Sequence, residues 1–174
     1  SHTLLLTARE RLHIAVLIVG HTHHLEGSLH ALLYLLLVDL LEFEAESDIV
    51  VLAVPVGAAV RMLPMVLDRF GELKDDAKTV IDVCSTKEQL ARCVKYHPQR
   101  RQYVATHPMA GTEYSGPWAA MPGLFDGHAC IICDSEESSP KAVRKVESLY
   151  ETLNMRTIYM NSSNHDVHAA YVSH

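Results

Sequence analysis

The segment "DIVVLAVPVG", residues 48–57, decides the fold class of this protein. It is a short, uninterrupted apolar run rich in β-branched residues, and Pro55 ends it because proline cannot donate to a strand ladder. A strand that is apolar on both faces has to be covered on both faces, which is typical of parallel sheets. The segment therefore predicts a strand of a parallel sheet, buried on both faces.

Further strands and helices alternate along the chain around this segment. The other predicted strands cover residues 12–20, 78–86, 101–108, 127–134 and 156–160. The predicted helices cover residues 58–73, 87–94 and 138–153. The first is either continuous through Pro64 or divided into two short helices. A Leu/Ala-rich stretch after Ser28 is compatible with a further helix. This alternation predicts an α/β fold with a doubly wound, mostly parallel sheet that is Rossmann-like.

Composition and charge narrow the class of protein. The 174 residues are 48% hydrophobic and 21% charged, which is typical of one globular domain, or of one domain and the start of another. The formal net charge is −6, and the densest basic run, residues 92–101, reads as a solvated helix end and loop. No nucleic-acid partner is therefore expected. The longest apolar run, residues 29–43, is shorter than the ~20 residues that span a bilayer, so no membrane partner is expected either.

The cysteines and histidines raise the question of metal binding. The four cysteines are scattered rather than framed as a disulfide scaffold, and we expect core cysteines in a reducing cytoplasm. They are Cys84, Cys93, Cys130 and Cys133. Three of the twelve histidines, His21, His23 and His24, lie close together. They could form a metal site if another ligand closed it, but we expect a solvated loop or a loop that lines an anion site, and no metal.

Four loops at the carboxyl ends of the predicted strands hold most of the candidate catalytic groups. They are residues 20–28, 55–57, 84–87 and 107–113. Any one of these loops could be ordinary turn chemistry. Ligands of open α/β sheets bind beyond the carboxyl ends of the strands, so the four together predict a ligand site at this edge.

Four motifs resemble the prephenate dehydrogenase (TyrA) family. They are "DIVVLAVPVG", "VIDVCSTK", "HPMAGTEYSG" and "HDVHAAYVSH", which occur in this order between residues 47 and 174. The third, residues 107–116, is the most specific of them. The resemblance implies an enzyme that oxidatively decarboxylates prephenate, or its amino analogue arogenate, with NAD or NADP on the way to tyrosine. It also implies a cytoplasmic homodimer when the protein is full-length.

The resemblance assigns roles to individual residues. His107 matches the family's catalytic histidine, which takes the ring hydroxyl of the substrate as hydride leaves, and a neutral imidazole is suited to accept that proton. Ser85 matches a serine that holds the same hydroxyl. The residues that match the substrate pocket are Gly111, Thr112, Glu113 and His174. The residues that match the strand end beside the dinucleotide are Val54, Pro55 and Val56.

Two other residues near this edge receive structural interpretations. Lys87 opens a predicted helix; it could face a phosphate or a carboxylate, but it is expected to be solvated. Asp82 ends a predicted strand and is expected to cap the following turn.

The predicted dinucleotide loop departs from the family pattern. Gly20 stands for the first glycine of the motif and Gly27 and Ser28 for its last two residues, but the middle glycine, which lets backbone approach the pyrophosphate, is not evident. Asp39 has the spacing, ~20 residues beyond Gly20, of the acid that binds the ribose. Too few residues separate Ser28 from residue 47 for the elements that the family places there, so we expect that residues are missing. The choice between NAD and NADP stays open.

The domain division follows from the same resemblance. Residues 1–160 are expected to form the dinucleotide-binding domain, and residues 161–174 only the start of an all-helical C-terminal domain for substrate binding and dimerisation. This polypeptide is therefore expected to be weak or inactive, whereas its full-length parent is a dehydrogenase. The rival interpretations are a non-catalytic nucleotide-binding or regulatory module and a His-rich metal-binding protein.

Overall fold

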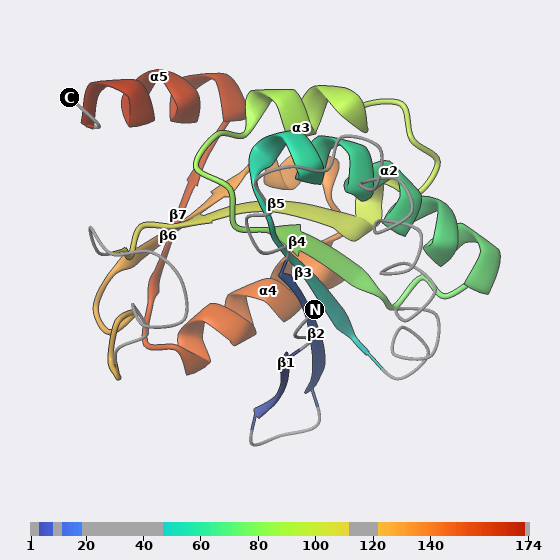
Figure 1. The fold of residues 1–174 in the computed structure, drawn as a ribbon, viewed down its shortest axis with the longest axis horizontal. Helices are drawn as coiled ribbons and strands as arrows, with labels where there is room; N and C mark the ends of the chain where they lie inside the picture. Colours follow the sequence, from blue (N-terminus) through green and yellow to red (C-terminus); the bar gives the residue numbers. More distant parts are fainter. Residues whose placement is uncertain (1–3, 9–11, 19–46, 112–121, 173–174) are drawn as a thin grey trace, which may run out of the picture.

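The computed structural model describes residues 4–8, 12–18, 47–111 and 122–172, and these ranges form one seven-stranded sheet with helices on both faces (Figure 1). The strands are β1 (Leu4–Ala8), β2 (Leu12–Ile18), β3 (Ile49–Ala53), β4 (Thr79–Asp82), β5 (Tyr103–Pro108), β6 (Ala129–Cys133) and β7 (Arg156–Met160). They lie in the sheet in the order in which they occur in the chain. The six predicted strands are confirmed, and β1 was not predicted.

The direction of the strands is mostly parallel, as predicted. Strands β2 to β5 run parallel to one another, and β7 runs parallel to β6. The two exceptions are β1, which is antiparallel to β2, and β6, which is antiparallel to β5. The carboxyl ends of β2, β3, β4 and β5 therefore share one edge of the sheet, where a ligand site is expected.

Alternate residues of the central strands face two separate hydrophobic cores. Val50 and Leu52 of β3 pack with α2 (Val56–Leu73) and α3 (Glu88–Cys93), whereas Ile49 and Val51 pack with α4 (Pro140–Thr152). Because successive side chains of a strand point to opposite faces, a strand that is apolar throughout requires this covering of both faces. Figure 1 shows α2 and α3 on the opposite side of the sheet from α4.

The helices follow from local sequence signals. In α2 the buried residues recur at helical spacing, and the helix is continuous through Pro64 rather than divided in two. In α4 the Ser139 hydroxyl accepts a hydrogen bond from the backbone N–H of Ala142 at 3.1 Å, and Pro140 occupies the first turn, as predicted. The buried residues of α2 are Ala59, Met62, Leu63, Val66, Leu67 and Phe70.

The last helix, α5 (Ser162–Val172), lies beside α3 (Figure 1). The helical segment expected after residue 160 is therefore present, and its assignment to a second domain stays a prediction. Nowhere in the described ranges does a helix combine the length and the apolar composition that crossing a membrane requires.

Two of the sequence interpretations about exposure are wrong. Cys93 is exposed, whereas Cys84, Cys130 and Cys133 are buried core residues as predicted. Arg100, within the basic run that was read as solvated, is buried, and its guanidinium donates a hydrogen bond to the Tyr103 carbonyl at 2.9 Å. The guanidinium also lies over the Tyr103 ring, 5.1 Å from its centroid, which accounts for its burial.

The prediction for Lys87 is also wrong, because its side chain is 0% exposed. Its ammonium group forms an ion pair with the Asp82 carboxylate and donates a hydrogen bond to the Thr106 carbonyl at 2.7 Å. Asp82 is itself 0% exposed and accepts further hydrogen bonds from the Tyr103 hydroxyl at 2.7 Å and the Cys84 N–H at 3.0 Å. The last of these confirms Asp82 as the cap of the turn after β4. The buried pair thus joins β4, β5 and the start of α3.

We expect replacement of Lys87 by methionine to destabilise the fold by about 3–5 kcal/mol, because it leaves the Asp82 carboxylate buried without a counter-charge. Chemical denaturation near neutral pH measures this loss. The matched control is Lys141→Met on exposed α4 surface, which should change the free energy of unfolding by less than about 0.5 kcal/mol. An unfolding free energy for Lys87→Met close to that of the control would contradict the prediction.

Candidate functional site

The carboxyl edge of the sheet brings together three of the four loops singled out in the sequence. The turn after β3 contributes Val54, Pro55 and Val56, the turn after β4 contributes Ser85, and the end of β5 contributes His107. Other predicted site residues lie outside the described residues. They are Gly20, Gly27, Ser28, Asp39, Thr112, Glu113 and His174, together with the three clustered histidines His21, His23 and His24.

The β3 turn leads directly into the amino terminus of α2. The Pro55 carbonyl accepts hydrogen bonds from the N–H groups of Ala58 at 2.8 Å and Ala59 at 3.0 Å, which starts the helix. The first turn of α2 carries no acidic side chain. Pro55 and Gly57 are exposed, and apart from the chain neighbours and the adjacent helix backbone no heavy atom of the described residues lies within 4 Å of the point where a Gly57 Cβ would be. This part of the edge offers room, and the helix dipole there favours an anionic group.

The β4 turn presents Ser85 between two anchored neighbours. Cys84 before it is tied by its N–H to Asp82, and Lys87 after it donates its N–H to the Asp166 carboxylate at 2.7 Å. Ser85 itself is exposed. Burial, more than its neighbour Asp82, raises the pKa of the Cys84 thiol to about 12, so this thiol stays protonated and is not a nucleophile near neutral pH. The Ser85 hydroxyl is thus open to a ligand, as is the exposed Thr86 beside it.

His107 lies at the end of β5 and is half-buried. Its Nδ1 is 2.9 Å from Nε2 of His165, and the two rings meet edge to face with centroids 5.0 Å apart. Burial, followed by the nearby His165 and Lys87, lowers the pKa of His107 to about 4. The imidazole is therefore neutral near neutral pH and able to accept a proton.

His165 and Asp166 of α5 complete this cluster, and neither was assigned a role from the sequence. His165 is 1% exposed, and its Nδ1 is 2.8 Å from the Asp166 carboxylate. The same carboxylate accepts hydrogen bonds from the backbone N–H groups of Lys87 and Glu88, at 2.7 and 2.9 Å, and so caps α3 from the neighbouring helix. Burial alone would raise the pKa of Asp166, but the hydrogen bonds from Glu88, His165 and Lys87 together lower it. The available signal was the adjacent His–Asp pair that begins the motif at residues 165–174.

Gly111, predicted to permit close approach of a ligand, lies just beyond β5 and is exposed. In the described part of the chain, no heavy atom other than those of its two chain neighbours lies within 4 Å of the point where its Cβ would be. Contacts among the described residues therefore do not require glycine here, and its role toward a ligand stays a prediction.

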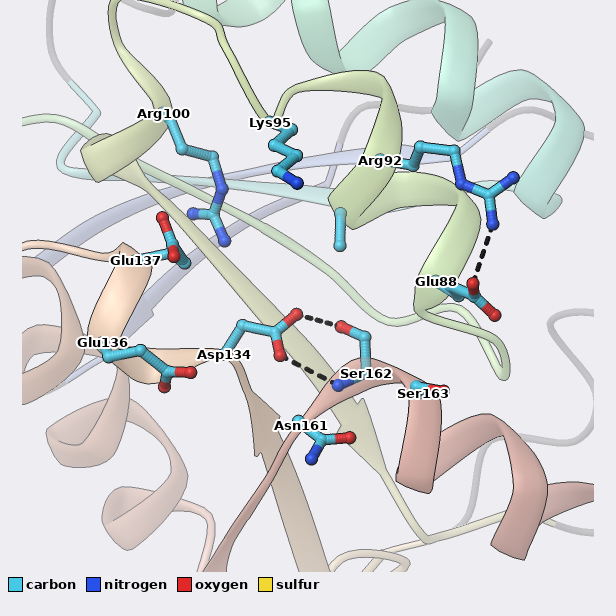
Figure 2. Close-up of a pocket in the computed structure, with 11 residues that line it drawn as sticks. Glu88, Arg92, Lys95, Arg100, Asp134, Glu136, Glu137, Asn161, Ser162 and Ser163 are labelled. Atoms are coloured by element: carbon cyan, nitrogen blue, oxygen red, sulfur yellow. Dashed lines mark hydrogen bonds and ion pairs between the residues drawn. The ribbon is translucent and has the colours of Figure 1, made fainter.

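A separate pocket of about 340 Å³ opens between α3, the amino terminus of α5 and the 3₁₀ turn η3 (Ser135–Glu137) (Figure 2). Figure 2 shows that two of the acidic groups lining it already have partners: Glu88 pairs with Arg92 at 2.7 Å, and Asp134 accepts the N–H of Ser162 at 2.9 Å. His107 is not among the lining residues. Because acids and bases are mixed in its lining and Arg92 and Glu88 already pair with each other, this pocket indicates no particular ligand.

Metal binding can be judged only within the described ranges. There, no three or more His, Cys, Asp or Glu side chains come together in a way that could hold a metal ion. The histidine cluster at residues 21–24 lies outside these ranges.

Comparison with known proteins identifies relatives of the chain. The family described as "Prephenate dehydrogenase, nucleotide-binding domain" matches residues 18–159. A cyclohexadienyl dehydrogenase of Zymomonas mobilis is 29% identical over 140 residues, which are 78% of this chain and 45% of that protein. A prephenate dehydrogenase of Lactococcus lactis is 28% identical over 139 residues, which are 79% of this chain and 36% of that protein. The chain therefore spans less than half the length of these relatives.

A solved structure shows the same arrangement. The prephenate dehydrogenase of Aquifex aeolicus superimposes with a TM-score of 0.59 at 25% identity, over 72% of this chain and 44% of that one. A second structure of the Aquifex protein contains hydroxyphenyl propionate and NAD+, and it superimposes with a TM-score of 0.56 at 24% identity, over 69% of this chain and 40% of that one. The likeness supports the Rossmann-like fold.

We expect His107 to titrate at about pH 4, well below the usual 6.5, because the folded protein disfavours its charged form. Between these two pH values the unfolded chain binds more protons at His107 than the folded protein does. The contribution of His107 to the free energy of unfolding is therefore at its most favourable above pH 6.5 and is lost as pH falls toward 4. Following the imidazole resonances of the chain by NMR gives the midpoint directly.

A variant checks the same prediction through stability. In His107→Asn the dependence of unfolding free energy on pH in this window should become shallower by up to about 1.4 kcal/mol per pH unit, the effect of one proton. A midpoint for His107 at or above 6.5 would contradict the prediction.

Proposed function

Because the chain belongs to the prephenate dehydrogenase family through its nucleotide-binding domain, we propose that it serves an enzyme that oxidatively decarboxylates prephenate with NAD or NADP. The observation that carries the proposal is the position of the His107 imidazole, at the carboxyl edge of a parallel sheet beside the exposed Ser85 turn. This is the edge at which doubly wound sheets bind dinucleotides.

The described residues fit a nicotinamide dinucleotide. We assign Val54, Pro55 and Val56 to contacts with the cofactor, and the start of α2 supports this with open space at Gly57 and no acid in its first turn. We assign the phosphate contacts to Gly20, Gly27 and Ser28 and the ribose contact to Asp39, on the sequence pattern. A nicotinamide dinucleotide held by these residues would supply the hydride acceptor for oxidation of the carbinol carbon of the substrate ring.

His107 takes the proton in the proposed reaction. As the carbinol carbon is oxidised, the O–H bond of its hydroxyl breaks and the proton moves to the neutral imidazole, while Ser85 holds the same oxygen. The bond to the ring carboxylate then breaks, carbon dioxide leaves, and the electrons of that bond restore the aromatic ring. We propose that Gly111, Thr112, Glu113 and His174 shape the substrate pocket.

The substrate could instead be arogenate, which differs from prephenate in carrying an amino group on its side chain. Both compounds are cyclohexadienyl acids, and one relative is named for that class. A panel of both substrates with NAD and NADP, on the chain and on any longer polypeptide that contains it, separates the four combinations. Nucleotide binding without turnover in the longer polypeptide would favour a non-catalytic module.

The remaining proposals concern the setting of the enzyme. The unpaired Cys84, Cys93, Cys130 and Cys133 are compatible with a reducing cytoplasm. We propose a homodimer for the full-length protein, and weak or absent turnover for this chain alone. Measuring prephenate-dependent NADH formation by the chain tests the latter, and robust turnover would overturn it.

We expect His107→Asn to lower kcat by ~10²–10⁴ because the substitution removes the proton acceptor. The dissociation constant of the nucleotide, measured by calorimetry, should barely change. His128→Asn, which alters an exposed histidine in the turn before β6, is the matched control and should leave both quantities unchanged. An unaltered kcat in His107→Asn would remove this role from His107.

A further inference from the structure

Three side chains form a hydrogen-bonded series that ends at the proposed proton acceptor: Asp166, His165 and His107. We propose that His165 and Asp166 are positioning residues that keep the proton of His107 on Nδ1, so that Nε2 stays free to accept the proton of the substrate hydroxyl. The catalytic consequence rests on the proposed function of His107. The tautomer itself can be measured without any substrate.

The series begins at a carboxylate whose position is fixed by the fold. Asp166 accepts the N–H groups of Lys87 and Glu88 at the amino terminus of α3, and an ionised carboxylate can only accept hydrogen bonds. The hydrogen bonds that hold it also lower its pKa, which keeps it ionised near neutral pH. At the 2.8 Å contact, Nδ1 of His165 must therefore be the donor.

The protonation of His165 in turn determines which nitrogen of His107 carries a proton. A neutral imidazole carries one proton, so a His165 that donates from Nδ1 has a lone pair on Nε2. His107 must then donate from its own Nδ1 across the 2.9 Å contact. Its Nε2, on the other side of the ring from that contact, is left unprotonated. A free neutral imidazole favours the opposite tautomer, so the protein has to impose this one.

A doubly protonated His165 would impose the opposite tautomer on His107. If His165 carried protons on both nitrogens, its Nε2 would donate, and His107 would have to hold its proton on Nε2, where it could not accept another. His165 is 1% exposed, and its Nε2 faces His107 rather than a carboxylate, so a proton on Nε2 would have no anionic partner within this series. The proposed tautomer of His107 therefore requires the neutral form of His165.

The arrangement also suits the state that follows proton transfer. When Nε2 of His107 gains a proton, the ring becomes a cation whose Nδ1–H still donates to His165. His165 in turn donates to the Asp166 carboxylate, so the negative charge supports the new positive one through the intervening ring. The same two contacts therefore orient the ring before the transfer and stabilise it afterwards.

The direct test is the tautomer of His107 in the chain labelled with ¹⁵N at histidine. Long-range proton–nitrogen correlation spectra near neutral pH distinguish protonated from unprotonated ring nitrogens, and His107→Asn and His165→Gln assign the signals. We expect protonated Nδ1 and unprotonated Nε2 for both His107 and His165. A His107 ring protonated on Nε2 overturns the proposal, and this result needs no variant that might fail to fold.

A pair of substitutions then tests whether His165 imposes the tautomer. The side-chain carbonyl of His165→Gln can replace Nε2 as the acceptor and should preserve it, whereas His165→Phe has no acceptor and should shift His107 toward the Nε2–H form. His168→Phe, at an exposed position of the same helix, is the control and should change nothing. A folded His165→Phe chain that keeps the original tautomer would show that His165 does not set it.

Kinetics separate this proposal from the proposed function. In a polypeptide that turns over substrate, His165→Phe should lower kcat by about 10- to 100-fold with KM within about threefold, and His165→Gln should recover most of the loss. If His107→Asn leaves kcat unchanged, the proposed function fails, and the tautomer measurement still decides the positioning role. If His107→Asn abolishes turnover but the ring is protonated on Nε2, only the positioning role fails.

Discussion

The buried ion pair between Asp82 and Lys87 is the interaction on which the arrangement of the site depends. It lies where β4 ends and α3 begins, and it also holds β5 through the Tyr103 hydroxyl and the Thr106 carbonyl. A buried pair of charges is tolerated only when both partners are present and their remaining hydrogen-bonding capacity is satisfied. Both partners are present here and each makes further hydrogen bonds, so the turn that carries Ser85 and the strand that carries His107 are fixed relative to each other.

The position of β3 could be predicted because this strand is apolar on both faces, a property that is visible in a single sequence, whereas β1 was not predicted. The burial of Lys87 could not be predicted in this way. It depends on two hydrogen-bond acceptors, the Asp82 carboxylate of β4 and the Thr106 carbonyl of β5, which only the folded sheet brings together. A lysine at a helix start is usually solvated, and the sequence contains no local signal to the contrary. The burial of Arg100 could not be predicted for the same reason, because its guanidinium contacts the backbone carbonyl and the ring of Tyr103.

Motifs located His107 and Ser85 at one edge of the sheet, but not the groups that act on His107. His165 lies 58 residues further along the chain, and it reaches His107 only because α5 packs beside α3. Comparison with a family motif identifies the residue expected to contact the substrate. It does not identify the residues that hydrogen-bond to that residue and hold it in place. Those residues are found in the structure by tracing the hydrogen bonds from a candidate base, here from His107 to His165 and from His165 to Asp166.

Asp166 has two duties at once, since it caps α3 and anchors His165. The consequence concerns how this protein can change over evolution or in the laboratory. A substitution at residue 166 alters helix stability and histidine orientation together, so neither property can be tuned there independently of the other. Selection for thermal robustness and selection for turnover would both retain the aspartate, and variation should instead be accepted at exposed neighbours such as Val167 and His168.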